Sequence, residues 1–329
     1  MACAPTASSP PGGGAASTAT GTQAGGPTGV DGGLPVGPAH PPDPSQRPYN
    51  VVRSTRTFAD SSRPTPAGTA TPELPERTLV TEFYVPQADG PLPLVIFGHG
   101  LLGHPDKFTE LLTRWAEAGY LVAAPAFPLT NSKVDGASGN ARDVWQQPGD
   151  ISFVLDTLLA ATNSAGDPLQ GKVDVTRLAA AGLSLGGATT LGLAYNACCR
   201  DARFRAFQVL AGNPIPLERA YDFSDPTPIL FVHGDRDESL SIQAELDAFR
   251  RAKSPKWFVT LIGGSHAPPF EDDVTPWDAY VGHITTAFWD LKLAPVGGAP
   301  GHASPDPDAV ARFETLLASA PELARPEAP

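Results

Sequence analysis

Short hydrophobic runs that are typical of β-strands alternate along this chain with stretches whose hydrophobic residues recur at helical spacing. The alternation is regular between Arg77 and Leu293, as in a mostly parallel sheet that is covered by helices on both faces. We therefore predict a doubly wound α/β domain, with residues 77–86 as its edge strand. Further strands are predicted at residues 92–100, 120–128, 177–184, 204–212, 228–235 and 256–264, and helices at residues 105–119, 148–162, 186–197, 241–252 and 276–293.

The two ends of the chain differ in composition from this central block. Residues 1–48 are rich in proline, glycine and serine and hold almost no large hydrophobic residue, so we expect a disordered tether. Residues 294–329 form a proline-rich tail, in which the hydrophobic spacing of 309–324 predicts one short helix. The predicted folded domain therefore spans residues 49–293, with its core at 77–293.

Composition and charge narrow the classes of protein to which the chain can belong. The hydrophobic content of 41% suffices for a sizeable core, whereas a net charge of -12 and a pI near 4.9 offer no positive field to nucleic acid. No hydrophobic run reaches the length of a membrane-spanning helix. The chain also lacks paired C-x-x-C, H-E-x-x-H and phosphate-loop motifs, so we expect no metal and no cofactor.

One strand-to-helix turn carries a serine between glycines. The pentapeptide Gly182-Leu183-Ser184-Leu185-Gly186 fits the pattern G-x-S-x-G and lies between a predicted strand and a predicted helix. In such a turn the glycines avoid Cβ clashes, and the serine hydroxyl stands above the carboxyl end of the sheet, where ligands bind in α/β proteins. We therefore predict that Ser184 is a nucleophile rather than only a small residue in a tight turn.

A serine nucleophile needs a histidine as its base. In this topology the histidine follows the acid along the chain, which leaves three of the seven histidines as candidates. His302 lies in the polar tail and His283 within a predicted amphipathic helix, whereas His266 follows a predicted strand in the loop "GGSHAPPF". We predict that His266 is the base.

The acid that orients this histidine is expected at the end of the preceding strand, where Asp235 and Asp237 both lie. Asp237 is favoured because "GDRDESL" matches the spacing G-x-x-D-x-x-[VL] that follows this strand in many serine hydrolases. Asp235 is expected to brace the loop instead.

Two backbone N–H groups should complete the site by binding the negative oxygen of a tetrahedral intermediate. The first is expected from Leu185, directly after the nucleophile. The second is expected from the turn after residues 92–98, where the glycines of "FGHGLLGH" let the backbone bend inward and Leu101 is favoured over Leu102.

Five segments of the chain together resemble the α/β-hydrolase superfamily. They are "LVIFGHGLLGHPDKFTELLTRWAEAGYLVAAPAFP", "QPGDISFVLDTLL", "AAAGLSLGG", "FVHGDRDESL" and "GGSHAPPF". The chain is most similar to bacterial secreted esterases and lipases of the dienelactone-hydrolase-like and platelet-activating-factor-acetylhydrolase-like type. The resemblance covers about residues 77–293 and implies a Ser184, Asp237 and His266 triad that hydrolyses carboxylic esters through an acyl-enzyme.

Two departures from these families bear on the substrate. Dienelactone hydrolases in the strict sense use a cysteine nucleophile where this chain has Ser184, which favours an esterase. Cutinase-like polyester hydrolases carry an aromatic residue where this chain has Leu101, which weakens a claim on aromatic polyesters. Trp145, in the polar loop 129–147, is a candidate for lining the substrate pocket and equally for packing, and the short connection 212–228 leaves no room for a large cap domain.

We therefore expect a monomeric serine hydrolase that cleaves a small-molecule, lipid-like or polymeric carboxylic ester. Two alternatives stay open. The same triad supports peptide hydrolysis or acyl transfer, because all three reactions share the acyl-enzyme. A surface binding protein with the same fold and no turnover is the second alternative.

The three cysteines bear on the cellular location and the redox state of the protein and not on the reaction. Cys3 follows a small residue and precedes the linker, which resembles the start of a mature bacterial lipoprotein, so we expect a secreted or cell-surface lipoprotein with a lipid anchor at Cys3. Cys198 and Cys199 are expected to be reduced, because a ring closed between neighbouring cysteines is strained.

Overall fold

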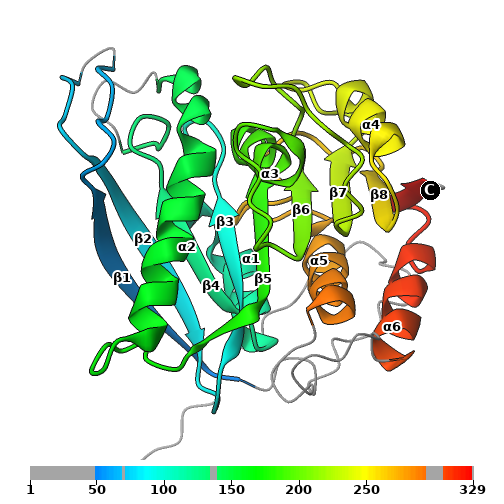
Figure 1. Ribbon diagram of the computed structural model, residues 1–329. Coiled ribbons are helices and arrows are strands. Elements are labelled where there is room, and N and C mark those ends of the chain that lie inside the picture. Colours follow the sequence, from blue (N-terminus) through cyan, green and yellow to red (C-terminus); the bar gives the residue numbers. More distant parts are fainter. Residues whose placement is uncertain (1–48, 69–70, 134–138, 294–306, 328–329) are drawn as a thin grey trace, which may run out of the picture. The chain divides into compact units, whose positions relative to one another are not determined.

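A single mixed sheet runs through the domain (Figure 1). The computed structural model describes residues 49–68, 71–133, 139–293 and 307–327. Within them the sheet has nine strands in the order β1-β2-β4-β3-β5-β6-β7-β8-β9. The strands are β1 (Val51–Asp60), β2 (Arg77–Pro86), β3 (Leu92–Gly98), β4 (Leu121–Ala126), β5 (Val173–Leu183), β6 (Ala206–Leu210), β7 (Ile229–Gly234), β8 (Lys256–Leu261) and β9 (Ala324–Glu327).

The six central strands, β4, β3, β5, β6, β7 and β8 in sheet order, all run parallel to one another. Every residue of β3, β4, β6 and β7 is buried, because both faces of a parallel sheet are covered and the strands consist mostly of hydrophobic residues. The antiparallel pairs lie towards the edges, where β1 joins β2, β2 joins β4 and β9 joins β8.

Helices pack on both faces of this sheet. Leu155, Leu191 and Phe249 belong to the hydrophobic core on one face, which α2, α3 and α4 cover. Trp115, Phe288 and Phe313 belong to the core on the other face, which α1, α5 and α6 cover. The helices are α1 (Thr109–Glu117), α2 (Gln147–Asn163), α3 (Leu185–Tyr195), α4 (Ile242–Arg251), α5 (Asp278–Lys292) and α6 (Pro307–Ala318). This arrangement confirms the predicted doubly wound, mostly parallel sheet.

The first edge of the sheet differs from the prediction. Strand β1 pairs with β2 along its whole length, so residues 77–86 form an inner strand and not the edge. Most residues of β1 are exposed or half-buried, and polar residues such as Arg53 and Arg56 lie among them. Its hydrophobic pattern was therefore too weak to predict a strand.

The sheet and its helices also include residues beyond the predicted boundary at residue 293. Helix α6 spans Pro307–Ala318, so it begins before the predicted helix 309–324 and ends earlier, and the chain then turns back to add β9 antiparallel to β8. The Phe313 ring packs at 5.5 Å from the Trp257 ring of β8, so the segment 307–327 belongs to the same fold. The predicted tether 1–48 and Cys3 lie outside the described residues.

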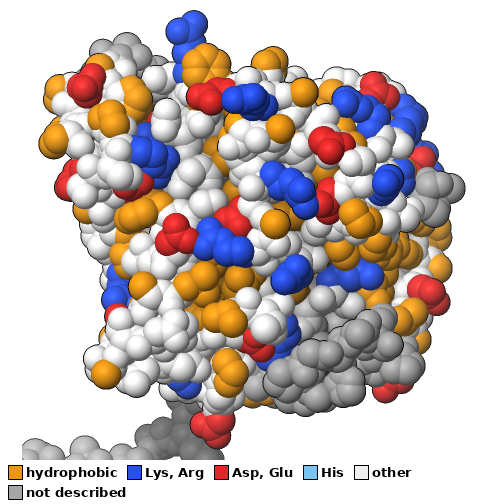
Figure 2. All heavy atoms as spheres, in the orientation of Figure 1, with side chains coloured by type: hydrophobic (Ala, Val, Ile, Leu, Met, Phe, Trp, Pro, Cys, Tyr) orange, Lys and Arg blue, Asp and Glu red, His pale blue; other side chains and the backbone are white. Residues whose placement is uncertain are grey.

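The connection between β6 and β7 bears on access to the site. Residues 211–228 form turns and bends with one isolated bridge, Asn196 to Tyr221, so no helical cap is inserted there. On the face seen in Figure 2, Lys and Arg side chains lie among Asp and Glu side chains, with hydrophobic side chains between them. Among the described helices, none has both the length and the hydrophobicity to cross a bilayer.

Candidate active site

Three of the predicted residues meet beyond the carboxyl ends of β5, β7 and β8. Ser184 Oγ lies 2.8 Å from His266 Nε2, and His266 Nδ1 lies 2.6 Å from Asp237 Oδ2. Because an ionised carboxylate can only accept, Nδ1 carries the ring proton and Nε2 is left to accept the serine proton. The catalytic roles of these residues remain predictions, but the structure brings all three into one hydrogen-bonded chain.

Ser184 lies in a strained turn that the surrounding backbone holds in place. Its φ of 57° and ψ of -114° are rare for a residue with a side chain. The Ser184 N–H donates to Leu210 O at 2.8 Å, which joins the turn to β6. A Cβ atom on Gly182 would lie 2.3 Å from Gly186 O, so the turn closes only with glycine at that position.

The three side chains differ in exposure as their proposed roles require. The Asp237 side chain is 1% exposed and the His266 side chain 14% exposed, while Ser184 is half-buried. Burial raises the pKa of Asp237, but hydrogen bonds from the Leu240 N–H and His266 outweigh it and hold that pKa below its ordinary value. Asp237 is therefore ionised at neutral pH, and its side chain is shielded from water.

The structure separates the two candidate acids. Asp235 is exposed, and its Oδ1 accepts the Gly263 N–H at 2.7 Å, which braces the loop before the histidine. Asp237 instead turns inward, where its Oδ1 accepts the N–H groups of Ser239 and Leu240 at 2.8 and 2.7 Å. Of the two aspartates, Asp237 is the one that forms a hydrogen bond with His266.

Both predicted oxyanion donors belong to segments next to Ser184. Leu185 begins α3 directly after Ser184, where a helix leaves its first N–H groups without internal partners. A Cβ atom on Gly100 would lie 3.0 Å from Ser184 Cβ, so the turn that carries Leu101 packs against the serine. The Leu102 N–H donates to Thr130 O at 2.7 Å and is therefore occupied, which leaves Leu101 as the candidate in this turn.

His99, which the sequence did not single out as a functional residue, holds this turn. The ring is fully buried; its Nε2 accepts the Phe127 N–H at 3.0 Å, and its Nδ1 donates to Gly100 O at 2.7 Å. Burial lowers the pKa of His99 to about 4, so the ring is neutral at physiological pH. It thereby ties the turn that carries Leu101 to the chain that follows β4.

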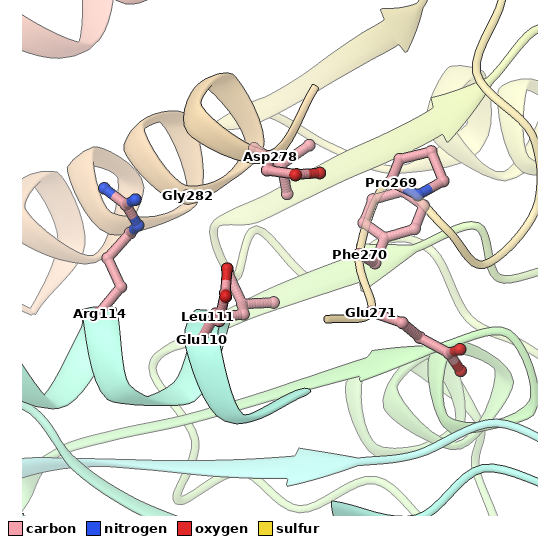
Figure 3. Close-up of a pocket in the computed structure, with 9 residues that line it drawn as sticks. Glu110, Leu111, Arg114, Pro269, Phe270, Glu271, Asp278 and Gly282 are labelled. Atoms are coloured by element: carbon pink, nitrogen blue, oxygen red, sulfur yellow. The ribbon is translucent and has the colours of Figure 1, made fainter. Parts of the chain in front are cut away.

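The loop after His266 is anchored to the start of α1. Asp272 accepts the N–H groups of Thr109 and Glu110 at 2.8 and 2.9 Å, so an acid from a distant segment caps this helix. Beside this anchor, Pro269, Phe270 and Glu271 line a pocket of about 40 Å³ with residues of α1 and α5 (Figure 3). This pocket is too small for an ester substrate.

Trp145 and the cysteine pair lie together on another part of the surface. The Trp145 indole N–H donates to Pro216 O at 3.1 Å, and the side chain lines a hollow of about 470 Å³ with Cys198 and Cys199. These cysteines form a disulfide, so the expectation of reduced thiols was wrong. They lie in a turn after α3, in which Asn196 Oδ1 accepts the Cys198 N–H at 3.0 Å.

The parallel sheet, the serine turn after β5 and the acid and histidine after β7 and β8 define an α/β-hydrolase. A model of the dienelactone hydrolase family matches residues 80–259, more than half of the chain, and the chain belongs to this family. The match includes Ser184 and Asp237 and ends before His266. No curated protein matches the chain. The protein is therefore a hydrolase, and the predicted resemblance is confirmed at the level of family and fold.

Proposed function

We propose that the protein is a serine hydrolase that cleaves carboxylic esters through an acyl-enzyme. The observation that carries the proposal is the continuous chain from Ser184 Oγ through both nitrogens of His266 to Asp237 Oδ2. Dienelactone hydrolases in the strict sense use cysteine as nucleophile, whereas a serine with this base and acid is the arrangement of serine esterases.

In the proposed reaction, Ser184 Oγ attacks the ester carbonyl carbon while His266 Nε2 takes the hydroxyl proton. Asp237 stabilises the imidazolium that forms, and the N–H groups of Leu101 and Leu185 bind the oxyanion. His266 then gives its proton to the leaving alcohol, which frees the alcohol and leaves the acyl-enzyme. Water, activated by His266, attacks the acyl carbon and releases the carboxylic acid with the serine restored. Each oxyanion donor contributes about 3 kcal/mol to such a step.

The surroundings of the serine support a substrate with a hydrophobic part. Leu101 and Leu102 are 41% and 38% exposed on the turn that packs against Ser184, where their side chains are available to an acyl or alcohol group. The uncapped connection 211–228 adds no helical lid. The exposed leucines favour an ester with a hydrophobic part over a polar peptide backbone, and the uncapped connection leaves room for small or extended esters. We keep Trp145 as a proposed contact for a longer substrate.

The test is steady-state hydrolysis of p-nitrophenyl esters from acetate to palmitate by the wild type and by Ser184→Ala. We expect turnover that disappears in the folded variant, and the chain-length profile measures the acyl pocket. Turnover that persists in Ser184→Ala contradicts the proposal. Cleavage of peptide substrates without cleavage of esters would assign the triad to peptide hydrolysis instead.

A further inference from the structure

A second histidine, besides His266, contacts the proposed catalytic acid Asp237. His233 is the next-to-last residue of β7, and its side chain is fully buried. Its Nε2 lies 2.9 Å from Asp237 Oδ2 and 3.2 Å from Leu240 O. Asp237 Oδ2 is therefore in contact with two imidazole rings, the second being that of His266 at 2.6 Å.

Glu245 of α4 completes this arrangement. Its side chain is fully buried, and its Oε2 contacts His233 Nδ1. The residue lies on the inner side of α4 with Leu246 and Phe249, where a carboxylate is costly to bury without a partner. Five side chains thus form one row, Glu245, His233, Asp237, His266 and Ser184, that begins in the core and ends at the nucleophile.

His233 and Glu245 form the inner pair of this row. The acceptors around them determine which of their atoms carry protons. His233 Nε2 faces a carboxylate and a carbonyl oxygen, so it carries a proton and donates. His233 Nδ1 and Glu245 then share one further proton. Burial raises the pKa of Glu245 to about 7, whereas Glu245 and Asp237 outweigh burial and raise the pKa of His233, so this proton is retained near neutral pH. The pair is neutral overall and presents an N–H to Asp237.

The titratable groups around the pair come from three elements. Glu245 faces His233 from α4, and Asp237 faces it from the β7–α4 loop. His266, from the loop after β8, faces the other side of the Asp237 carboxylate, and Glu271 of the same loop interacts electrostatically with His266. A change in the protonation or position of His233 and Glu245 therefore affects His266 through the carboxylate of Asp237.

We propose that His233 and Glu245 are positioning residues for the reaction, which hold the Asp237 carboxylate towards His266 and, by donating to it, weaken its stabilisation of the His266 imidazolium. This inference rests on the proposed function of the triad. Each N–H donated to a carboxylate disperses its negative charge, so Asp237 stabilises the His266 imidazolium less than a carboxylate with one imidazole partner would.

The test compares wild type with Glu245→Gln, which keeps the size of the side chain but removes the carboxylate that raises the pKa of His233. His233 then donates to Asp237 only as a neutral imidazole, which is a weaker donor. The pH dependence of Ser184 labelling by a fluorophosphonate and of kcat/KM is measured for both. We expect the acid limb of both profiles to move to higher pH by about 0.5 unit or more in the variant, with KM changed by less than about twofold. His233→Gln, which alters the donor itself, should move the limb in the same direction.

Asp290→Asn is the matched control. Asp290 is a buried carboxylate on α5 whose Oδ1 accepts the Tyr120 hydroxyl at 2.7 Å, so this variant also replaces a buried acid with an amide. Its acid limb should coincide with that of the wild type. A folded Glu245→Gln protein whose limb also coincides with the wild type overturns the inference.

A second readout does not depend on turnover. The proton between His266 Nδ1 and Asp237 gives a low-field ¹H NMR signal in triads of this kind, and we expect its position to change in Glu245→Gln and to stay constant in Asp290→Asn. A wild type that neither labels nor hydrolyses esters refutes the proposed function, whereas an unchanged signal in Glu245→Gln refutes the coupling of the inner pair to the triad. The two failures are therefore distinguishable.

Discussion

The carbonyl oxygen of Gly98 lies 2.0 Å from the position that a Cβ atom would occupy on Gly186. The end of β3 and the first turn of α3 are therefore pressed together, with Ser184 held between them. This contact fixes the start of α3, directly after Ser184, relative to the turn that carries Leu101. It requires glycine at position 186 because backbone atoms of two packed elements cannot move apart cheaply.

Gly186→Ala should accordingly destabilise the protein by more than about 3 kcal/mol and abolish activity, because the methyl group forces β3 and α3 apart. Urea unfolding and ester hydrolysis measure the two effects. Gly192→Ala on the same helix is the control: its methyl group would meet the flexible end of Leu217 at 2.9 Å. We expect that variant to change stability by less than about 1 kcal/mol, since alanine also favours the helix. Equal losses in both variants would contradict the explanation.

The two neighbouring aspartates should differ sharply on substitution. Asp237→Asn should lower kcat by about 10³-fold or more, because the amide neither stabilises the His266 imidazolium nor fixes its tautomer. Asp235→Asn should cost less than about tenfold, since an amide oxygen still accepts the Gly263 N–H. Steady-state kinetics of both variants decide between the residues. The account is wrong on this point if Asp235→Asn is the more damaging change.

The main features of the fold and of the triad follow from local patterns in the sequence. Buried parallel strands are recognisable as continuous hydrophobic runs, and Ser184 is marked by the glycines that its turn requires. Asp237 and His266 could be placed because the order of the three residues along the chain is restricted in this topology. Each of these signals resides in a few neighbouring residues or in their order.

Other features depend on contacts between distant segments, which local patterns do not encode. Strand β1 gains its place by pairing with β2, although most of its residues are not buried. Asp272 caps a helix that precedes it by more than 150 residues, at Thr109. Glu245 gave one usable signal, since it falls on the hydrophobic side of α4, but its partner His233 becomes evident only when β7 and α4 are packed together.

Acid should destabilise the protein in part through His99. The pKa of His99 is lowered to about 4 by burial, against 6.5 for an ordinary histidine. Between these values the unfolded chain binds a proton that the folded protein does not, so this group makes stability rise with pH and fall as pH drops from about 6.5 to about 4. The expected loss across this window is about 1–3 kcal/mol.

Urea unfolding of wild type and His99→Gln at several pH values in this window measures the effect. Glutamine does not titrate, so the difference in stability between the two proteins isolates His99 from the other ionisable groups. We expect the wild type to lose stability relative to the variant as the pH falls. A difference that is constant with pH would show that His99 does not carry the predicted linkage.

Asp272→Ala should affect both stability and catalysis. Loss of its bonds to the first N–H groups of α1 should lower stability by about 1–2 kcal/mol, and it releases the loop that carries His266. We expect kcat to fall more than KM changes, because the base is displaced while substrate contacts elsewhere persist. The exposed neighbour Asp273 provides the control, and Asp273→Ala should leave both quantities nearly unchanged. A matching loss in that variant would point to surface charge rather than the cap.

The central claim is that Ser184 becomes covalently acylated during turnover. Mass spectrometry of the protein after rapid acid quench of p-nitrophenyl ester hydrolysis, followed by proteolysis, tests it directly. We predict an adduct with the mass of the acyl group on the peptide that contains Ser184, absent in Ser184→Ala and strongly reduced in His266→Ala. Ester hydrolysis by the wild type together with an acyl adduct on a different residue, or with unimpaired turnover in Ser184→Ala, would contradict the account.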